Sequence, residues 1–278
     1  MLIDKNITLT GRNAALALNS GNGHRISRGA AVTLSGANAA FSANGQDYKG
    51  VHTLAQLKAI DANLSGHYVL GSDIAGQGYF TALAGGQREF SGVFDGLGHT
   101  ITDLSIYGNG QALGMFERVS GTVRNMTLDR ATVNGMQSPW ATQLGVLAGF
   151  NSGNIDNVHA TNSSVMGSRN PHVVGGLVGN YFWGDISNSS FSGNVLGNAG
   201  STAIGGLVGL VQDTPRAKQI SNSAAHAYIA GGSYDNPANG TAVGGTVSAT
   251  LAPNCATCAA AARSRCSMPM PAWAGWSA

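Results

Sequence analysis

Five aspartates are spaced so that they could meet on one outer face of a repeating fold. They are Asp95, Asp103, Asp129, Asp156 and Asp185. Polysaccharide-cleaving enzymes need clustered carboxylates, either to bind calcium or to act as an acid–base pair. Asp103 and Arg124 could face Asp156 across neighbouring coils and form such a groove. The alternative is structural, because Asp and Asn are common turn residues, and most related positions hold Asn, which neither ionises nor acts as a base.

The cysteines and histidines give little support for a metal or nucleophilic site. Cys255 and Cys258 form a CxxC, but structural zinc needs a second pair or histidine partners, and only Cys266 follows. The histidines are scattered without ligand spacing: His24, His52, His67, His99, His159, His172 and His226. We expect most of them at the surface or at corners, although His99 and His159 could meet. The sequence therefore predicts no catalytic residue, no metal site and no cofactor.

Four aromatic residues lie close to a repeated phrase of the sequence. They are Trp140, Tyr181, Phe182 and Trp183. Sugar-binding surfaces use exposed aromatic faces, so a glycan site is one interpretation. The other is that these rings cover coil edges or fill corners, which we favour because single exposed apolar residues need no special explanation.

The repeated phrase is the element that must position all of these residues. Its copies are VGGLVG at Val174–Gly179, IGGLVG at Ile204–Gly209, LGVLAG at Leu144–Gly149, and the weaker echoes LGMF at Leu113–Phe116 and VGGTV at Val243–Val247. Successive copies begin 31, 30, 30 and 39 residues apart. A near-constant period of this size predicts a solenoid, in which each unit stacks on the next.

A second pattern runs in step with the first, in which an apolar residue is followed two positions later by Asn or Asp. The pairs are Ile101/Asp103, Val123/Asn125, Ile155/Asn157, Ile186/Asn188 and Ile220/Asn222. We expect the polar members to form one ladder of stacked side-chain amides. We also expect FDGLGHTITDLSI at 94–106 to lie over FERVSGTVRNMTL at 116–128 without a gap.

Each unit is too short to bury its own apolar face, because its apolar phrases are about one strand long. Stacking equivalent strands gives parallel ladders with roughly 4.8 Å between coils and a continuous apolar interior. The prediction is an all-β fold, a right-handed parallel β-helix, with the hand taken from general fold rules. The glycines beside each apolar pair suit either corners with positive φ or close approach between coils.

The chain divides into three predicted parts. Residues 1–74 hold short strands and one short helix near 53–62, with Thr53 as N-cap, and form early coils or a cap. Residues 75–249 form the β-helix, with loops at 212–219 and 231–240 as contact sites. Residues 250–278 hold all three cysteines and a run of alanines, and we expect a disordered or aberrant tail, in the manner of a reading-frame change.

The composition excludes several classes of protein. Charged residues make up 10%, the formal net charge is +2, and glycine accounts for 41 of 278 residues. A nucleic-acid-binding protein would carry a clustered basic face. No apolar run approaches the roughly 18–20 residues of a membrane span, and the first residues, MLIDKNITLT, do not have the pattern of a signal peptide.

The phrases VGGLVGN…ISNSSFSGNV and IGGLVG…ISNSAA resemble the GLUG motif of bacterial surface and secreted proteins. The upstream text NITLTGRNAALAL and FSGVFDGLGHTITDLSIYG is similar to filamentous-haemagglutinin-like exoproteins of two-partner secretion. Together the resemblance covers about residues 4–249, and this chain departs from the family in lacking the leader and the N-terminal secretion domain.

The resemblance implies the shaft of a secreted or surface-exposed adhesin of a Gram-negative bacterium, without catalysis. It implies a host or neighbouring-cell receptor or glycan as partner, and an outer-membrane transporter that exports the full-length protein. Two alternatives remain open at this point. One is a β-helical polysaccharide lyase or hydrolase built on Asp103, Arg124 and Asp156; the other is an inactive truncated gene fragment.

Overall fold

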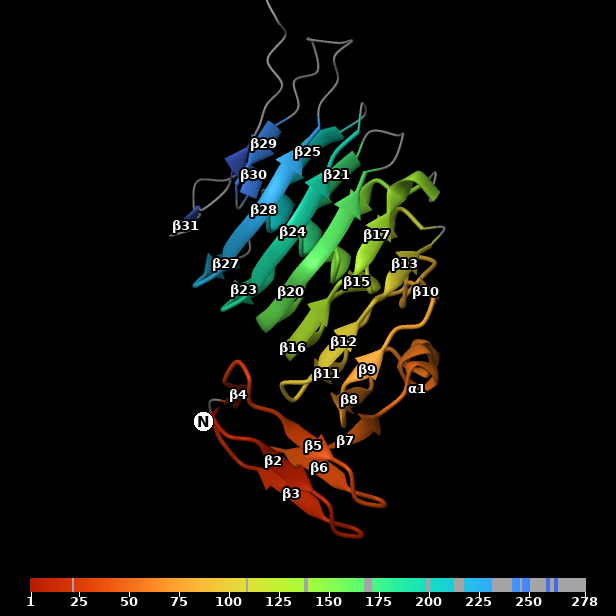
Figure 1. The fold of residues 1–278 in the computed structure, drawn as a ribbon, viewed down its shortest axis with the longest axis vertical. Helices are drawn as coiled ribbons and strands as arrows, with labels where there is room; N and C mark the ends of the chain where they lie inside the picture. Colours follow the sequence, from red (N-terminus) through yellow and green to blue (C-terminus); the bar gives the residue numbers. More distant parts are fainter. Residues whose placement is uncertain are drawn as a thin grey trace, which may run out of the picture.

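The chain folds as a β-solenoid of about five turns, with 55% of its residues in strands and one short helix of nine residues (Figure 1). This is the predicted fold class. The computed structural model describes residues 1–21, 23–108, 110–137, 140–167, 172–198, 201–212, 218–231, 242–245, 247–250, 259–260 and 263–264.

Residues 1–43 form two small parallel coils, here called the N-terminal coils. Three strand pairs build them: β1 (Leu2–Ile3) with β4 (Arg25–Ile26), β2 (Ile7–Leu9) with β5 (Val32–Leu34), and β3 (Ala15–Leu18) with β6 (Ala40–Ala43). Ile7 pairs with Val32, so one coil takes 25 residues here. Alternation of apolar and polar residues, as in Ile7–Leu9, suits strands that bury one face.

A hairpin and a short helix connect the N-terminal coils to the rest. The hairpin joins β6 to the antiparallel β7 (Gln46–Val51) through Asn44 and Gly45, whose φ values of 50° and 77° suit the tight turn favoured between twisted strands. Helix α1 (Leu54–Lys58) continues into η1 (Ala59–Ala62). The predicted helix and its cap are confirmed, since the Thr53 hydroxyl accepts from the backbone N–H of Gln56 at 3.2 Å.

The largest sheet runs along one side of the solenoid and receives strands from every coil (Figure 1). Beyond β3, β6 and β7, it contains β8 (His67–Leu70), β9 (Ile74–Ala75), β10 (Tyr79–Thr81), β11 (Val93–Asp95), β12 (Thr100–Thr102), β13 (Ser105–Tyr107), β16 (Thr122–Asp129), β17 (Thr132–Asn134), β20 (Asn154–Met166), β23 (Gly184–Ser187), β24 (Ser190–Leu196), β27 (Lys218–Ser221), β28 (Ala224–Ala230), β31 (Ala259–Ala260) and β32 (Arg263–Ser264). A 3₁₀ turn, η2 (Gly135–Gln137), follows β17. The strands β31 and β32 fall within the predicted tail and pair with β28.

Two five-stranded sheets close the solenoid, and the repeated phrase builds both. One contains β14 (Ala112–Leu113), β18 (Gln143–Leu144), β21 (His172–Gly175), β25 (Ser201–Gly205) and β29 (Ala242–Gly244). The other contains β15 (Phe116–Val119), β19 (Ala148–Asn151), β22 (Val178–Tyr181), β26 (Val208–Val211) and β30 (Val247–Thr250). Val174 pairs with Leu144 on one side and Ile204 on the other, as the spacing predicts.

The stacked phrases line a continuous apolar interior. The backbone N–H of Leu177 donates to the Leu207 carbonyl at 2.9 Å, and both side chains are fully buried. This main core extends from Val51 to Ile229. A smaller core fills the N-terminal coils and includes Val69 and Leu97 of the main solenoid. The boundary between the two predicted parts at residue 74 stays a prediction.

The glycines of the repeated phrase serve close packing between backbones. A Cβ on Gly176 would lie 2.2 Å from the Gly206 carbonyl oxygen, and one on Gly175 would lie 1.9 Å from that of Val178. Neither glycine has a positive φ. Of the two roles predicted for these glycines, close approach is therefore the one they fulfil.

Asparagines supply the left-handed corners, and the predicted single ladder proves to be two. Asn125 and Asn157 have φ values of 53° and 57°, and the Asn157 amide donates to the Asn125 Oδ1 at 2.9 Å. The stack is interrupted at Asn188, whose amide donates to Asp156 at 2.6 Å instead. Asp103 belongs to a second corner, because its N–H donates to the Asp129 carbonyl at 2.9 Å. Short polar side chains tolerate this backbone conformation best.

The predicted gapless superposition of 94–106 on 116–128 is wrong. Phe94 pairs with Val123 rather than with Phe116, and Ile101 pairs with Leu128. These pairings span 29 and 27 residues, so the earlier coil holds two extra residues at the corner between them. The two segments look alike because both carry the same strand pattern, which by itself does not fix the register.

Candidate functional site

The carboxylates of the predicted groove do not converge. Arg124 and Asp156 are register neighbours on β16 and β20, but Asp103 lies at the second corner, five residues further along β16 from Arg124 and beside Asp129. Arg130 donates from Nε and Nη2 to Asp103 at 2.8 and 2.9 Å. The predicted three-residue groove is therefore wrong, because the two-residue register shift moves Asp103 onto another edge.

The remaining aspartates are engaged in structural hydrogen bonds or exposed. Asp129 accepts from the Thr161 hydroxyl at 2.7 Å and from the Asn162 amide at 2.8 Å. Asp156 accepts from Ser187 at 2.7 Å and lies 3.5 Å from an Arg25 nitrogen. Asp185 is exposed on β23. These are contacts between successive coils, as expected for turn residues in a solenoid.

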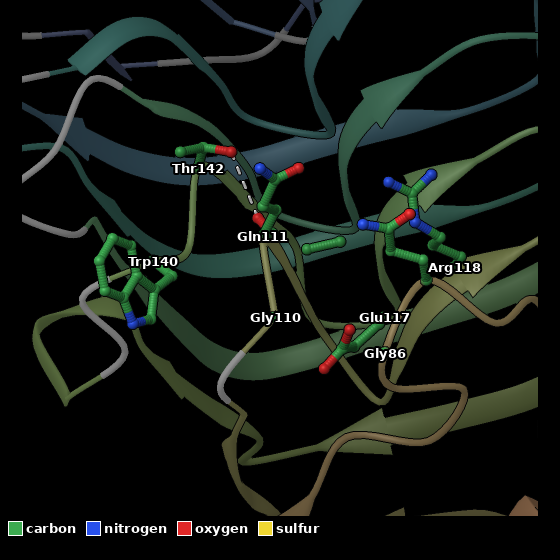
Figure 2. A pocket seen from close by; sticks show the side chains of 9 residues that line it. Gly86, Gly110, Gln111, Glu117, Arg118, Trp140 and Thr142 are labelled. Carbon is green, nitrogen blue, oxygen red and sulfur yellow. Dashed lines mark hydrogen bonds between the residues drawn. The ribbon is translucent and has the colours of Figure 1, made fainter.

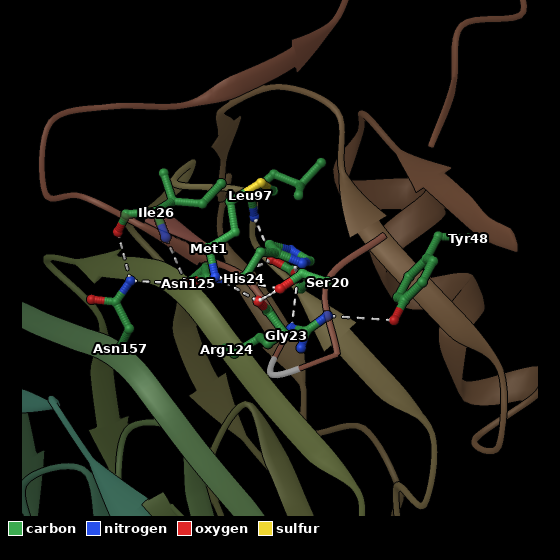
Figure 3. A network of polar contacts seen from close by, with 11 residues as sticks. Met1, Ser20, Gly23, His24, Ile26, Tyr48, Leu97, Arg124, Asn125 and Asn157 are labelled. Atoms are coloured by element: carbon green, nitrogen blue, oxygen red, sulfur yellow. Dashed lines mark hydrogen bonds and ion pairs between the residues drawn. The ribbon is translucent and has the colours of Figure 1, made fainter. Parts of the chain in front are cut away.

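Asp95 and Arg124 belong instead to a buried polar cluster that ties the N-terminal coils to the main solenoid (Figure 3). Asp95 is fully buried and lies 2.7 Å from His24 Nε2. Arg124 donates to the same carboxylate oxygen at 2.8 Å, and Asn125 donates to the other at 3.1 Å. We call His24, Asp95, Arg124 and Asn125 the polar clasp.

The clasp keeps Asp95 ionised. Burial alone would raise the pKa of this carboxyl, but the hydrogen bond with His24 and the charges of Arg124 and His24 outweigh it, with a further contribution from the Leu97 N–H. The pKa of Asp95 is therefore lowered from its ordinary value. A buried ion pair of this kind is costly to break from one side, because a charge is then left without a partner.

Three of the seven histidines are buried, which the sequence did not predict. His24 packs in the clasp, His99 lies 3.0 Å from both Asp73 Oδ1 and the Val32 carbonyl oxygen, and His172 lies 2.8 Å from Ser201 Oγ. His52, His67 and His159 are half-buried and His226 is exposed. His159 lies 2.9 Å from Ser190 Oγ, and among the described contacts none joins it to His99.

Several predicted features lie outside the described residues. They are Cys255, Cys258, Cys266 and most of the loops 212–219 and 231–240. Within the part of the chain that the structure describes, no group of three His, Cys, Asp or Glu side chains could hold a metal ion. Among the same residues, no helix has the length and apolar character needed to cross a membrane.

The four aromatic residues divide between the two interpretations. Tyr181 is buried and fills a corner, with its hydroxyl donating to the Gly184 carbonyl. Phe182 and Trp183 are half-buried, with ring centroids 4.7 Å apart, and Phe182 lies 5.7 Å from Phe150. Trp140 is 68% exposed and lines a cavity, so it is the one that suits a binding surface.

This cavity, of about 600 Å³, is the site with the most chemical character among the described residues (Figure 2). Its lining consists of Gly86, Gln87, Gly110, Gln111, Ala112, Glu117, Arg118, Trp140 and Thr142. In Figure 2, Trp140 and Arg118 lie on opposite sides of the Glu117 carboxylate. We call it the Glu117 pocket. Its volume falls in the roughly 300–1,000 Å³ range of small-molecule sites.

The pocket exists because Glu117 occupies a glycine position of the repeated phrase. Phe116 pairs with Ala148, so the next residue, Glu117, stands level with Gly149 of the following coil. A Cβ on Gly149 would lie 2.3 Å from the Leu113 nitrogen, so a side chain is excluded there. One coil earlier, strand β15 meets only an isolated bridge from Leu83, and the room left beside it accommodates the glutamate.

Glycines and a braced loop shape the floor of the pocket. A Cβ on Gly110 would lie 2.1 Å from a carboxylate oxygen of Glu117, and Cβ atoms on Gly85 and Gly108 would lie 3.3 and 3.2 Å from the other. Gly86 and Gln87 adopt positive φ values of 71° and 67°. Strained backbone of this kind persists only where the surroundings hold it in place.

An ion pair from the helical segment holds that loop. Asp61 of η1 accepts from the Ala84 N–H at 2.8 Å and from Arg88 Nη2 at 2.6 Å. Arg88 also donates from Nε to the Gly85 carbonyl at 2.9 Å. The predicted helix therefore helps to position one wall of the pocket.

Burial raises the pKa of the Glu117 carboxyl above its ordinary value. A hydrogen bond from the Gly86 backbone and the charges of Arg118 and Arg88 offset this in part, while Asp61 adds to it. Arg118 also lies over the Phe150 ring, with 4.7 Å from Cζ to the ring centroid. The result is a carboxyl that can accept hydrogen bonds when ionised and can donate one when protonated.

The sequence pattern contained a signal for Glu117 that the prediction did not use. The weak copy of the phrase, LGMF, was read only as far as Phe116. Extending it by one residue places a carboxylate where the other copies have glycine. A charged side chain in an otherwise invariant small-residue column of a repeat marks a local opening.

Comparisons with known proteins agree with the motif and the fold. Residues 170–196 match the family described as the GLUG motif. Halomucin from Haloquadratum walsbyi is 34% identical over 144 residues, covering 46% of this chain and 2% of that protein. The chain thus spans about 2% of the length of the curated relative it matches.

Two solved structures share part of the architecture. One is a crystal structure of a protein provisionally named immunoglobulin A1 protease from Bacteroides ovatus, with a TM-score of 0.49 and 19% identity over 72% of this chain and 71% of that one. The other is titled IgA1 protease, with a TM-score of 0.42 and 16% identity over 77% of this chain and 21% of that one. We base no functional statement on likenesses of this size. The chain carries a GLUG motif within a β-solenoid, and this combination indicates an extracellular surface protein.

Proposed function

We propose that this chain is a shaft segment of a longer adhesin, whose rod of stacked coils displays binding surfaces and performs no catalysis. The observation that carries the proposal is the continuous parallel register from Leu113 through Leu144, Val174 and Ile204 to Val243. A stack of this kind extends by adding units and suits a spacer. The separation of Asp103 from Arg124 and Asp156 favours this role over the polysaccharide-cleaving alternative.

We further propose a location on the cell surface or in the medium of a Gram-negative bacterium. In this proposal an outer-membrane transporter exports the full-length protein, as in two-partner secretion. The partner at the other end is a receptor or glycan of a host or neighbouring cell. Loops 212–219 and 231–240 are the proposed contact segments, because insertions in a solenoid project from its side.

Adhesion and cleavage are separable by experiment. Beads coated with the full chain should attach to cultured epithelial cells or to neighbouring bacteria in a saturable manner, and free chain should compete. The same chain, incubated with calcium and acidic polysaccharides such as polygalacturonate or alginate, should release no oligosaccharides. Turnover that Asp156→Ala abolishes would contradict the proposal, as would attachment no greater than that of beads coated with an unrelated β-solenoid.

A further inference from the structure

The charges around the Glu117 pocket are close to balance. Glu117 and Arg118 are the charged residues among the described lining, and one carries each sign. Behind the wall, Arg88 and Asp61 are paired at 2.6 Å. An organic cation would face the guanidinium of Arg118, and an anion would face the buried carboxylate. The electrostatics therefore favour a ligand without net charge.

The lining combines one aromatic face with several hydrogen-bonding groups. Trp140 presents an exposed indole, and Gln87, Gln111 and Thr142 supply amides and a hydroxyl. The Glu117 carboxylate is 5% exposed at residue level and lies in a glycine cradle that leaves its oxygens near the cavity. A neutral ring with an apolar C–H face and a rim of hydroxyls matches this distribution, because the face can stack on the indole while the hydroxyls bond to the polar groups.

We propose that the Glu117 pocket binds a neutral saccharide, with one ring stacked on Trp140 and ring hydroxyls donating to the Glu117 carboxylate. The site goes beyond the proposed shaft role, since a shaft needs no pocket. It can also fail separately, because loss of saccharide binding would leave the stacked coils and bead attachment unchanged. Gly110 is part of the site, as a side chain there would meet the carboxylate.

Binding is tested with the full chain and a defined panel of sugars by saturation-transfer difference NMR and calorimetry. The neutral probes are lactose, chitobiose, mannobiose and maltotriose. The matched charged probes are 3′-sialyllactose, which is anionic, and the glucosamine dimer, which is cationic at neutral pH. At least one neutral probe should bind saturably, and it should bind more tightly than the charged probe of the same size.

Variants locate that binding. Trp140→Ala should weaken it about tenfold or more, since a stacked aromatic is typically a dominant contact. Gly110→Ala should weaken it by a similar factor, because the added methyl would meet Glu117. Tyr228→Ala, at an aromatic residue 50% exposed on β28 and away from the pocket, should leave affinity unchanged. Circular dichroism melting of each variant checks that the fold persists.

A pH profile tests the role of the carboxylate itself. The charged groups that face Glu117 are Arg118 from β15, Arg88 from the adjoining loop and Asp61 from η1. Affinity should fall as the pH drops through the raised pKa of Glu117, because protonation removes an acceptor. In Glu117→Gln, affinity should be several-fold weaker and flat across the same range.

Three results would overturn the proposal. The first is that none of the four neutral sugars binds saturably to the folded chain. The second is that binding occurs but is equally strong in Trp140→Ala and Gly110→Ala. The third is that a charged probe binds more tightly than its neutral counterpart, which would mean that the pocket recognises charge.

Discussion

The N-terminal coils and the GLUG coils are both parallel stacks, yet they are held together in different ways. In the GLUG coils, residues such as Leu177 and Leu207 stack without exposure, and glycines let the backbones approach closely. The N-terminal coils have a smaller core, with Leu9 and Leu18 each 8% exposed. Their attachment to the main solenoid depends on the polar clasp around Asp95 together with Val69 and Leu97.

The difference follows from what each region must do. A repeated apolar column accepts further identical units, so each GLUG coil can stack on any other. The clasp joins two coil types of unlike period, and it does so with directional contacts between Asp95, His24 and Arg124. Burying an ion pair adds little net stability compared with apolar packing, but removing one partner is expensive. The clasp therefore fixes one arrangement of the two regions.

The largest effect is expected from breaking the clasp. Asp95→Ala should destabilise the attachment of residues 1–43 by about 3–5 kcal/mol, because His24 and Arg124 lose a buried carboxylate partner. Hydrogen exchange should rise in residues 1–43 while residues 140–212 stay protected. Asp103→Ala is the matched control, since Asp103 is paired with Arg130 on the exposed surface, and we expect a change of about 0–1 kcal/mol. Equal effects from both variants would contradict the clasp.

Next in size is the loss of a stacked core residue. Leu177→Ala should lower the free energy of unfolding by about 2–5 kcal/mol, because it removes buried methyl groups and leaves a cavity. The matched variant is Leu9→Ala, whose side chain lies in the smaller core, and we expect it to cost less. Urea unfolding monitored by circular dichroism gives both values. If Leu9→Ala were the more damaging, the distinction between the two regions would fail.

A smaller effect is expected from closing the gap between coils. Gly176→Ala should cost about 1–3 kcal/mol, since its methyl would meet the Gly206 carbonyl and the Phe191 ring. Gly21 in the N-terminal coils has no atom within 4 Å of an added Cβ, so Gly21→Ala should change stability by less than about 0.5 kcal/mol. Thermal melting of the two variants decides the point, and a tolerated Gly176→Ala would argue against close backbone packing.

The mildest perturbation is acid. The lowered pKa of Asp95 means that its contribution is present at neutral pH, persists below the ordinary value of 3.8, and is lost as the pH falls through the lowered pKa. Pepsin cleavage within residues 1–50 should therefore begin at lower pH than expected for an ordinary aspartate. In Asp95→Ala the cleavage should already be rapid at the top of pepsin's range. A wild-type profile identical to that of the variant would contradict this.

Much of the fold could be predicted because the repeat is strict where packing is strict. The phrase fixes the register of Leu144, Val174 and Ile204, and the capped helix at Thr53 follows from local chemistry. Local resemblance failed at Asp103, because two extra residues at a corner shift the register without altering the strand pattern. The sequence also resembles filamentous-haemagglutinin-like exoproteins, and that finer relationship stays a prediction.

The site was harder to predict, because its residues are brought together by stacking rather than by sequence spacing. His24 meets Asp95 from 71 residues away, and nothing near either residue indicates the other. Trp140 could be chosen from the sequence as a possible sugar contact, but its partner Glu117 could not be recognised without the glycine column. A buried carboxylate in a repeat becomes visible only when the coils are aligned in three dimensions.

The central claim is that successive phrases lie directly on top of one another, one coil apart. Methyl–methyl nuclear Overhauser spectroscopy on the full chain, labelled at Ile, Leu and Val methyls, tests it most directly. Strong cross-peaks should join Leu144 to Val174 and Val174 to Ile204, because stacked strands lie roughly 4.8 Å apart. The cross-peak between Leu144 and Ile204, two coils apart, should be weak or missing. Cross-peaks that skip the Val174 layer, or none between successive layers, would contradict the stacked solenoid.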